Sequence, residues 1–272
     1  MYAARGASGI LAGVSAFPRL FYAHRGAPSE LPENTLPSFR RALERGATAL
    51  ETDAHMTADG QIVLSRDATG ARMANDPREI RKCTLDEVRR WDMGWGYVDP
   101  HGARPHARQG LCMPLLEELL RACPDVPVNV DAKQLAPDMV PTLVSLLRRL
   151  GAAERVRLAS FSTRTLRRIR AAGYPGPTGL GRSEVAALRL APRALLDRVR
   201  YHQIAAQIPT HVSLFRLDTA DFIARCHDLG VRVDYWTIDD PTEARRLLAL
   251  GADGIMTDDP ARIAPVFRSA GA

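Results

Sequence analysis

The chain has 272 residues, 46% of them hydrophobic, which is enough for one core of the size found in α/β barrels of about 250 residues. The net charge is +6, and arginine supplies nearly all of the positive charge. These arginines stand beside acids at helical spacing, as in SFRRALERG, which indicates a solvated helix surface and no nucleic-acid partner. No stretch approaches the roughly 20 apolar residues of a membrane span, and four scattered cysteines without a C-x-x-C pair predict neither a zinc site nor a disulfide framework.

Residues 1–19 form an extension ahead of the predicted domain. They contain an early arginine, a short apolar stretch and small residues near Ala16, which are the parts of a secretory signal. Ser and Gly interrupt the apolar stretch, and its positive region is thin. We therefore expect a cytoplasmic protein, with export as the alternative.

From residue 20 onward, short apolar runs alternate with helical patterns. The expected strands are 20–24, 47–55, 126–133, 155–161, 177–181, 203–209, 231–238 and 254–258. Helices such as 35–46, 221–230 and 241–251 lie between them, and several end in Gly just before the next strand. This alternation predicts an α/β fold, a closed (β/α)8 TIM barrel, in which chemistry is placed at the C-terminal ends of the strands.

The second strand continues into a hairpin with an acidic outward arm. Asp59–Gly60 is a strong two-residue turn signal, which pairs Ala58 with Gln61 and places Asp53 opposite Arg66. Glu51, Asp53 and His55 alternate along the strand and are expected on the same face. The hairpin thus predicts a cluster of two carboxylates, an imidazole and a guanidinium at a barrel mouth.

Residues 67–112 interrupt the alternation and are rich in Gly, Pro and Asp. The segment is too long for a plain loop, so we expect an insertion that caps one end of the barrel. The sequence shows no internal repeat and no second domain. We therefore assign residues 20–265 to a single domain and residues 266–272 to a C-terminal tail.

Seven segments carry a resemblance to a known family. They are AHRGAPSELPENTLPSF (23–39), LETDAHMTADGQIV (50–63), MPLLEELL (113–120), VNVDAK (128–133), LASF (158–161), VDYWTID (233–239) and GADGIMTDDP (251–260). In order and spacing they resemble the glycerophosphodiester phosphodiesterases, a TIM-barrel family, over about residues 20–265. The resemblance implies a hydrolase that converts glycerophosphodiesters to glycerol 3-phosphate and an alcohol.

The resemblance also implies one divalent cation, Mg²⁺ or Ca²⁺, held by Glu51, Asp53 and Asp131. Reasoning from the residues agrees, because carboxylates without cysteine or paired histidine favour a hard cation with oxygen ligands. Glu51 and Asp53 could alternatively belong to an ordinary salt-bridged hairpin.

Further site residues are expected around the phosphate. Arg25 offers a fork of donors for it, and Lys133, one of two lysines in the chain, is a plausible second contact. By resemblance, His24 is a catalytic histidine and Glu33 supports the site from behind, while Trp236 is expected to form a wall of the pocket.

The sequence departs from the family pattern in three places. Arg66 stands where the family has a histidine before Asp67, Asp131 stands where it usually has glutamate, and the threonines that usually follow the His-Asp pair are missing. Because arginine keeps its proton near neutral pH, Arg66 cannot act as general acid or base.

Three interpretations follow from these departures. In the first, the protein is a phosphodiesterase in which His55, or His101 or His106 of the insertion, covers the lost role. In the second, it binds phosphodiesters with little or no turnover. In the third, it carries out lysophospholipase D-type cleavage, with His24 doing more of the chemistry. The head group, the choice between soluble and lipid substrates and the oligomeric state are left open by the sequence.

Overall fold

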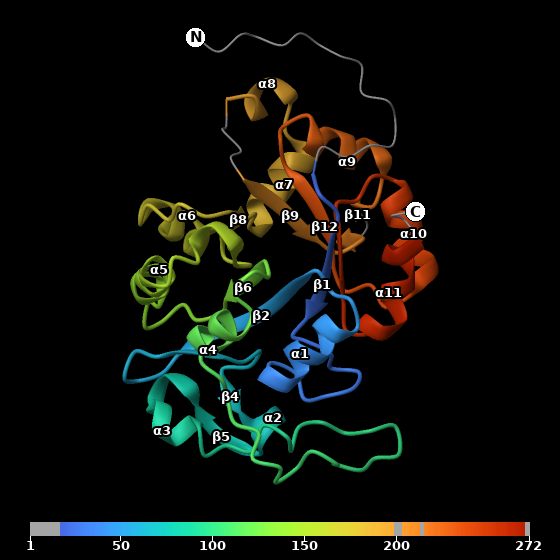
Figure 1. Ribbon diagram of the computed structural model, residues 1–272. Coiled ribbons are helices and arrows are strands. Elements are labelled where there is room, and N and C mark those ends of the chain that lie inside the picture. The colour runs from blue at the N-terminus through green and yellow to red at the C-terminus, as the bar shows by residue number, and fades with distance from the viewer. Residues whose placement is uncertain (1–16, 199–202, 213–214, 270–272) are drawn as a thin grey trace.

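The computed structural model describes residues 17–198, 203–212 and 215–269. Within these ranges, eight parallel strands close into a barrel that helices surround (Figure 1). The barrel strands are β1 (Leu20–His24), β2 (Ala49–Met56), β6 (Val128–Ala132), β7 (Val156–Ala159), β8 (Thr178–Gly179), β9 (Ile204–Ile208), β12 (Arg232–Tyr235) and β13 (Gly254–Thr257). Their order is β1-β13-β12-β9-β8-β7-β6-β2, and the pairing of β1 with β2 closes the ring. The predicted (β/α)8 barrel is confirmed, and each expected strand overlaps one of these eight.

The barrel helices follow the strands along the chain. They are α1 (Leu36–Glu44), α4 (Leu116–Ala122), α5 (Val140–Arg149), α6 (Thr163–Ala171), α7 (Arg182–Leu190), α8 (Arg193–Leu196), α9 (Ala220–His227), α10 (Pro241–Ala249) and α11 (Pro260–Ser269), with a short 3-10 turn η2 (Ala153–Arg155) before β7. None of the helices in the described ranges is both long and apolar enough to cross a membrane.

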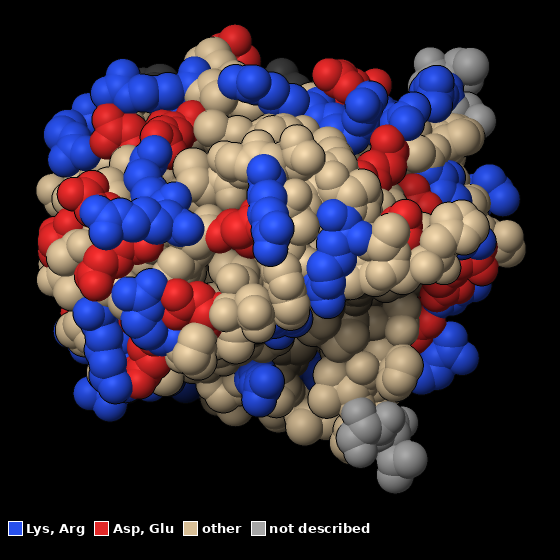
Figure 2. All heavy atoms as spheres, turned by 90° about the horizontal axis from the view of Figure 1, so that it is seen from below, with Lys and Arg blue, Asp and Glu red and all other residues tan. Residues whose placement is uncertain are grey.

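Many surface arginines are paired with acids. Arg121 Nη2 lies 2.7 Å from Glu117 Oε1 one helical turn away, and Arg41 Nη1 lies 2.9 Å from Glu44 Oε2. Figure 2 shows this interleaving of basic and acidic side chains on one face of the molecule. Exposed pairs of this kind contribute about 0 to 1 kcal/mol each, so they neutralise charge more than they stabilise the fold.

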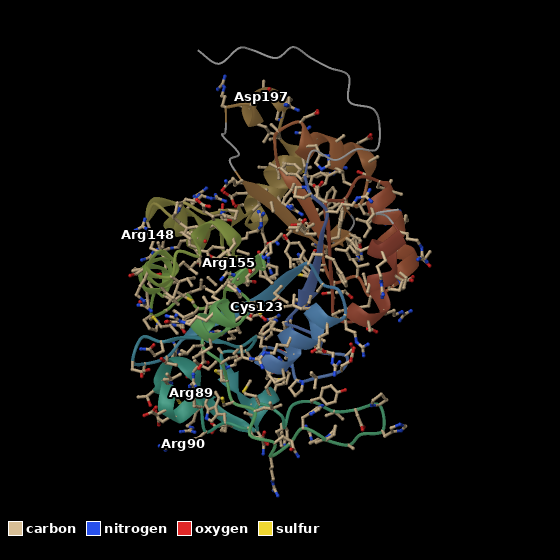
Figure 3. All side chains as sticks on the ribbon, viewed as in Figure 1. Arg89, Arg90, Cys123, Arg148, Arg155 and Asp197 are labelled. Atoms are coloured by element: carbon tan, nitrogen blue, oxygen red, sulfur yellow. The ribbon has the colours of Figure 1, made fainter. Side chains whose placement is uncertain are left out.

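One arginine binds the backbone between the end of a helix and the next strand. Arg155, near Cys123 in Figure 3, donates hydrogen bonds to the carbonyl oxygens of Leu120, Cys123 and Val126. These carbonyls lie at and beyond the C-terminal end of α4, where backbone acceptors lack partners within the helix. Arg155 therefore fixes the chain as it enters β6.

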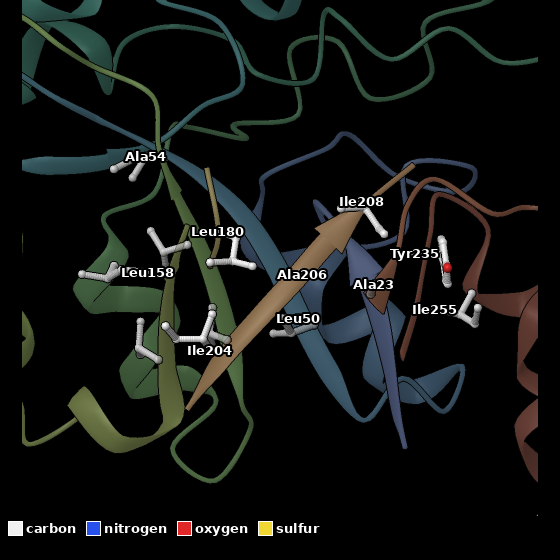
Figure 4. Close-up of a cluster of buried hydrophobic side chains, with 14 of the residues drawn as sticks. Ala23, Leu50, Ala54, Leu158, Leu180, Ile204, Ala206, Ile208, Tyr235 and Ile255 are labelled. Carbon is white, nitrogen blue, oxygen red and sulfur yellow. The ribbon is translucent and has the colours of Figure 1, made fainter. Parts of the chain in front are cut away.

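The main core lies between the outer face of the barrel and the helices. Figure 4 shows side chains from several strands in this layer, among them Leu50, Leu158, Ile204 and Ile255. All eight residues of β2 are buried, because helices cover its outer face and the barrel interior covers its inner face. Strand alternation therefore sends Leu50 outward and Glu51 inward.

The hairpin register differs by one residue from the prediction. β3 (Ile62–Leu64) pairs His55 with Val63 and Ala54 with Leu64, and the Ser65 amide donates to the Asp53 carbonyl oxygen at 3.0 Å. Ser65, and not Arg66, therefore lies opposite Asp53. The connection is a loop of three residues with Gly60 at a φ of +78°, a bulged arrangement that shifts the register relative to a two-residue turn.

The insertion at residues 67–112 builds a small core of its own. It contains β4 (Thr69–Gly70), α2 (Ala71–Ala74), β5 (Asp76–Glu79), the 3-10 turn η1 (Ile80–Lys82) and α3 (Leu85–Val88), and it lies at the lower end of Figure 1. Its buried side chains include Ile80, Trp91 and Met93, which cluster with Val63 of the hairpin. The insertion is thus anchored on the β2–β3 hairpin.

The chain ends differ from the predicted boundaries in one respect. α11 continues beyond residue 265, Val266 is buried in the main core, and the Phe267 ring stacks on Phe21 with centroids 4.8 Å apart. These residues belong to the barrel, so the predicted tail begins too early. The signal-like segment falls mostly in residues 1–16, which lie outside the described residues.

Candidate active site

The C-terminal ends of the strands surround a cavity of 590 Å³. Its polar floor comes from β1, β2 and β6 and the residues just after them. The floor residues are His24, Arg25, Glu51, Asp53, Asn129, Asp131 and Lys133. Parallel pairing places Glu51 beside Asn129 and Asp53 beside Asp131, so adjacent strands present their acceptors in two layers. Most of the predicted site residues are therefore gathered at one barrel mouth.

His24 ends β1 and is oriented by an acid from the other end of the chain. Its Nδ1 lies 2.7 Å from Asp258 Oδ1, just after β13, and its Nε2 lies 3.7 Å from Glu51 Oε2. Burial lowers the pKa of His24, but Glu51 and the hydrogen bond to Asp258 outweigh this effect and raise it above its usual value. With Nδ1 engaged, Nε2 is the ring nitrogen left to exchange protons in the cavity.

Arg25 enters the cavity from a tight turn. It has a φ of +58°, and the next residue, Gly26, has a φ of +96°. A Cβ on Gly26 would lie 2.8 Å from the backbone carbonyl carbon of Ser38, so only glycine fits this close approach. A non-glycine residue held in the left-handed region is uncommon and often marks a functional position. The turn directs the Arg25 Nε to within 3.0 Å of Asp53 Oδ2.

Asp53 is the centre of the charged floor. Besides Arg25, it contacts Lys133, whose Nζ lies 2.8 Å from Asp53 Oδ1 and 2.5 Å from Asp131 Oδ2. The Asn34 side-chain amide donates to Asp53 Oδ2 at 3.4 Å. Burial lowers the pKa of Lys133, but Asp131 and Asp53 raise it overall, so this ammonium is held charged between the two carboxylates.

Several buried oxygens of the floor have no hydrogen-bond donor. They are Glu51 Oε2, Asn129 Oδ1 and Asp131 Oδ1. Burial and the nearby Asp53 raise the pKa of Glu51 to about 8, and burial raises that of Asp131. Unpaired buried acceptors with raised pKa values are a donor set suited to a hard divalent cation, which would supply the missing positive charge.

The floor nevertheless differs from the predicted metal arrangement. Within the described ranges, no three His, Cys, Asp or Glu side chains converge closely enough to hold a metal ion. The Lys133 ammonium lies between Asp53 and Asp131, where the prediction placed a cation. The residue types fit the cation, whereas the side chains in their present positions do not form a three-ligand site.

Arg66, which directly precedes the insertion, lines the cavity. No ion pair with Asp53 is formed in the described structure, because Asp53 is paired with Arg25 and Lys133. Burial raises the pKa of the Asp131 carboxyl, while Lys133 and, to a smaller extent, the exposed Arg66 side chain oppose this rise. A contact between the Arg66 guanidinium and a bound phosphate stays a prediction.

Two predicted site residues lie behind the cavity. His55 is buried on β2 beyond the lining residues, and burial lowers its pKa. Glu33 lies 3.5 Å from Arg25 Nη1 and 2.6 Å from Arg72 Nη2, so it supports the Arg25 side chain from behind. His101 and His106, in the insertion, do not belong to the cavity lining.

The opposite wall of the cavity is apolar. It is formed by Phe161, Leu180, Val185, Leu190, Ile208, Val212, Phe215, Leu217, Trp236 and Met256. The half-buried Trp236 meets the Phe161 ring edge-on, with centroids 5.6 Å apart, and both side chains line the cavity. The cavity is thus polar on one side and apolar on the other.

Sequence reasoning missed two residues of the site. Asn129 lies two positions before Asp131 on β6, and this alternation could have indicated that it faces inward. Asp258 stands in the quoted GADGIMTDDP segment. Its contact with His24 depends on the pairing of β1 with β13, which links residues far apart in the chain.

Comparison with known proteins identifies similar chains. The model of the glycerophosphoryl diester phosphodiesterase family matches residues 24–262. A Caldanaerobacter subterraneus subsp. tengcongensis protein named glycerophosphodiester phosphodiesterase is 28% identical over 268 residues, which cover 93% of this chain and 99% of the relative. A Rattus norvegicus protein named lysophospholipase D GDPD1 is 24% identical over 271 residues, covering 88% of this chain and 83% of the relative.

A solved structure shares the fold. It is an Oleispira antarctica phosphodiesterase in complex with the product sn-glycerol-3-phosphate, and it superposes with a TM-score of 0.73 at 21% identity. The match covers 93% of this chain and 97% of that chain, so it extends over the whole barrel.

Proposed function

The chain belongs to the glycerophosphoryl diester phosphodiesterase family, and from this premise we propose that it hydrolyses glycerophosphodiesters to glycerol 3-phosphate and an alcohol in a cation-dependent reaction. The observation that carries the proposal is the cavity floor, where one oriented histidine faces buried carboxylates and two cationic side chains. A relative named glycerophosphodiester phosphodiesterase matches 93% of this chain, and a solved structure that holds glycerol 3-phosphate has the same fold.

The phosphate is proposed to bind between Arg25, Lys133 and Arg66. Arg25 presents a fork of donors from its strained turn, and Lys133 is a point charge directly after β6. Arg66 adds a guanidinium at the edge of the floor. Three cations around one anion provide tight binding, and Arg66 would retain this role even though it cannot transfer protons.

Glu51, Asp53 and Asp131 are proposed to hold the divalent cation, Mg²⁺ or Ca²⁺, together with the unpaired oxygen of Asn129. When bound, the cation would neutralise the phosphate and polarise it toward attack. The Lys133 ammonium is proposed to move from between the carboxylates to the phosphate when the cation and substrate enter. Glu33 keeps the Arg25 side chain in place.

His24 is proposed to carry the proton transfers. Hydrolysis requires that a nucleophile lose a proton and that the leaving alkoxide gain one. Among the described residues, His24 is the one histidine of the cavity lining. Asp258 fixes its tautomer, and Nε2 faces the reaction space. His55, set behind the floor with a lowered pKa, and the two insertion histidines are poorly placed to share this work.

A second candidate function is lysophospholipase D-type cleavage. The apolar wall opposite the floor favours it, because a small soluble diester would contact only the polar side, whereas an acyl chain would cover Phe161 and Leu180. The cleaved bond and the floor residues are the same in both reactions, so they differ in the substrate and not in the mechanism.

The test is hydrolysis of glycerophosphocholine and of lysophosphatidylcholine with Mg²⁺, with Ca²⁺ and with a chelator. We expect cation-dependent release of choline, and loss of about 10²- to 10⁴-fold in rate for His24→Gln. His101→Gln, at an exposed position of the insertion, is the matched control and should keep the wild-type rate.

Equilibrium binding of glycerophosphocholine tests the remaining alternative, in which the chain binds phosphodiesters without hydrolysing them. Binding without choline release under any of these conditions would mean that the chain is a phosphodiester-binding protein. Equal rates with the chelator and with either cation would contradict the cation dependence.

A further inference from the structure

The mouth of the cavity carries an unusual concentration of exposed apolar side chains. Of the seven exposed large hydrophobic residues in the described ranges, four line this cavity. We define the rim as these four residues and two arginines on the same edge. The rim residues are Phe161, Arg182, Arg189, Leu190, Val212 and Phe215.

One half of the rim is a helix face. Residues 182, 185, 186, 189 and 190 of α7 all line the cavity, and their spacing places them on one side of the helix. Leu190 at the end of this face is 68% exposed, whereas Leu188 on the opposite side is fully buried in the core. α7 therefore turns an apolar, arginine-flanked face toward the cavity and the solvent.

The other half is a short β-ribbon between β9 and α9. β10 (His211–Val212) pairs with β11 (Phe215–Arg216), and Val212 is the cross-strand partner of Phe215. Val212 is 52% exposed and Phe215 is 55% exposed. About half of each of these two neighbouring apolar side chains therefore remains open to solvent and available to a partner.

The charges of the rim have one sign. Arg182 and Arg189 form no ion pair with any described residue, and Arg182 instead lies over the Phe161 ring. From Ala159 onward the lining of the cavity contains these two arginines and no acid. The acids of the cavity are confined to its floor, so the rim presents uncompensated positive charge beside exposed apolar surface.

Phe161 connects this rim to the floor. Its ring centroid lies 5.3 Å from Arg182 Cζ and 5.0 Å from Lys133 Nζ. The apolar wall therefore continues without a break from the phosphate-binding floor to the exposed rim.

We propose that the rim is a docking surface for an anionic phospholipid bilayer. Headgroup phosphates would pair with Arg182 and Arg189, and Leu190, Val212 and Phe215 would enter the boundary between headgroups and acyl chains. The inference goes beyond the proposed hydrolysis, because docking requires neither a divalent cation nor turnover.

Charge distinguishes the bilayer from a second copy of this chain. A symmetric dimer would place the same patch on both sides, bringing four unpaired arginines together without an acid from either rim. An anionic bilayer provides both negatively charged headgroups for the arginines and an apolar interior for the exposed hydrophobic side chains. The bilayer is therefore the occupant that the rim chemistry fits.

The test uses the full chain, a chelator and two kinds of vesicle, one of phosphatidylcholine and one of an equal mixture of phosphatidylcholine and phosphatidylglycerol. We expect co-sedimentation with the mixed vesicles and binding about tenfold weaker to phosphatidylcholine alone. Higher salt should weaken binding to the mixed vesicles, because surface charge is screened.

Matched variants locate the contact. Val212→Ser is compared with Val98→Ser, since Val98 is 48% exposed on the insertion, away from the cavity lining. Arg189→Gln is compared with Arg90→Gln, an exposed arginine at the lower edge of Figure 3. We expect each rim variant to weaken vesicle binding by about fivefold, and the two controls to bind as wild type. Thermal melting checks that each variant is folded. If Val212→Ser does not fold, Arg189→Gln alone tests the contact.

Three results would overturn the proposal. They are absence of wild-type binding to the mixed vesicles, rim variants that bind as well as wild type, and equal losses in the control variants. A dimer in sedimentation equilibrium that Val212→Ser dissociates, without vesicle binding, would assign the rim to a second copy instead. Because the assay contains a chelator, loss of docking leaves the proposed hydrolysis standing, and loss of hydrolysis leaves docking standing.

Discussion

Arg66 places a permanent positive charge in the lining of the cavity. Its guanidinium adds positive charge near Asp131, yet it cannot supply or accept a proton near neutral pH. His24 is left as the cavity histidine that can do so. A site with strong anion binding and one proton-transfer group is expected to hold its substrate well and to turn over slowly.

The first prediction concerns this residue. Arg66→His should raise kcat for glycerophosphocholine by about 10- to 100-fold, because it adds a second acid-base group, and it should raise KM, because it removes a permanent charge. Steady-state kinetics give both values. Arg66→Gln is the control, since it removes the charge without adding a proton carrier and should raise KM alone. A wild-type kcat equal to that of the histidine variant would show that the site already has a full acid-base pair.

The second prediction concerns the contact between His24 and Asp258. Asp258→Asn should lower kcat by about 10- to 100-fold, as for other residues that orient a functional histidine. Asp258 helps to raise the pKa of His24, so its neutral replacement should lower that pKa. The acidic limb of the kcat/KM profile, where His24 becomes protonated, should then move to lower pH.

The pH profile distinguishes a loss of His24 orientation in Asp258→Asn from a loss of folding. Asp259→Asn, one residue further on, is the control, because Asp259 accepts a hydrogen bond from the Arg262 amide at the start of α11 and does not contact His24. An unchanged acidic limb in Asp258→Asn would mean that the contact is structural only.

At the scale of elements, the site depends on connections more than on regular structure. The turn after β1 directs Arg25 inward, and the bulged loop of the β2–β3 hairpin decides which residue faces Asp53. The turn and the loop each contain a glycine in the left-handed region. How much the free energy of unfolding falls when that glycine is replaced depends on whether the surroundings leave room for a side chain.

The third prediction tests this difference. Gly26→Ala should lower the free energy of unfolding by about 2 to 4 kcal/mol, because it combines a positive φ with overlap on Ser38. Gly60→Ala should cost about 1 kcal/mol, because Gly60 also has a positive φ but has nothing within 4 Å of its added Cβ. Urea unfolding measures both. Equal losses would mean that backbone conformation alone, and not the close approach to Ser38, requires glycine at position 26.

At the scale of the whole molecule, the folded barrel brings together charged groups that repel one another. Glu51, Asp53 and Asp131 come from two adjacent strands and are buried, and the raised pKa values of Glu51 and Asp131 record the cost of that burial. A bound cation would relieve this cost in the folded state alone. Cation binding should therefore stabilise the entire barrel.

The fourth prediction follows from that linkage. At a cation concentration of about 100 times its Kd, binding contributes about 2.7 kcal/mol, which corresponds to a rise in Tm of roughly 5 to 10 °C. Differential scanning calorimetry with Mg²⁺, with Ca²⁺ and with a chelator measures it. Asp131→Asn should lose most of the shift, whereas Asp86→Asn, on the exposed face of α3, should keep it. The same shift in both variants would place the cation elsewhere.

The sequence by itself determined the barrel and most of the cavity floor. Hydrophobic periodicity and glycine stops are local signals, and eight repeats of strand and helix leave few ways to bury the strands other than a closed ring. Alternation along β2 likewise places Glu51 and Asp53 inside, since successive side chains of a strand must face opposite ways.

Only the tertiary structure decided the remaining features. His55 shares its strand face with Asp53 but lies behind the floor, and Asp258 reaches His24 because the first and last barrel strands pair. Lys133 lies between two carboxylates because β2 and β6 are neighbours, and the rim joins α7 to a ribbon some twenty residues later in the chain. These contacts arise from long-range packing, which leaves no periodic signal in the sequence, so the arrangement of the charges and the exposure of the rim could be read only from the folded chain.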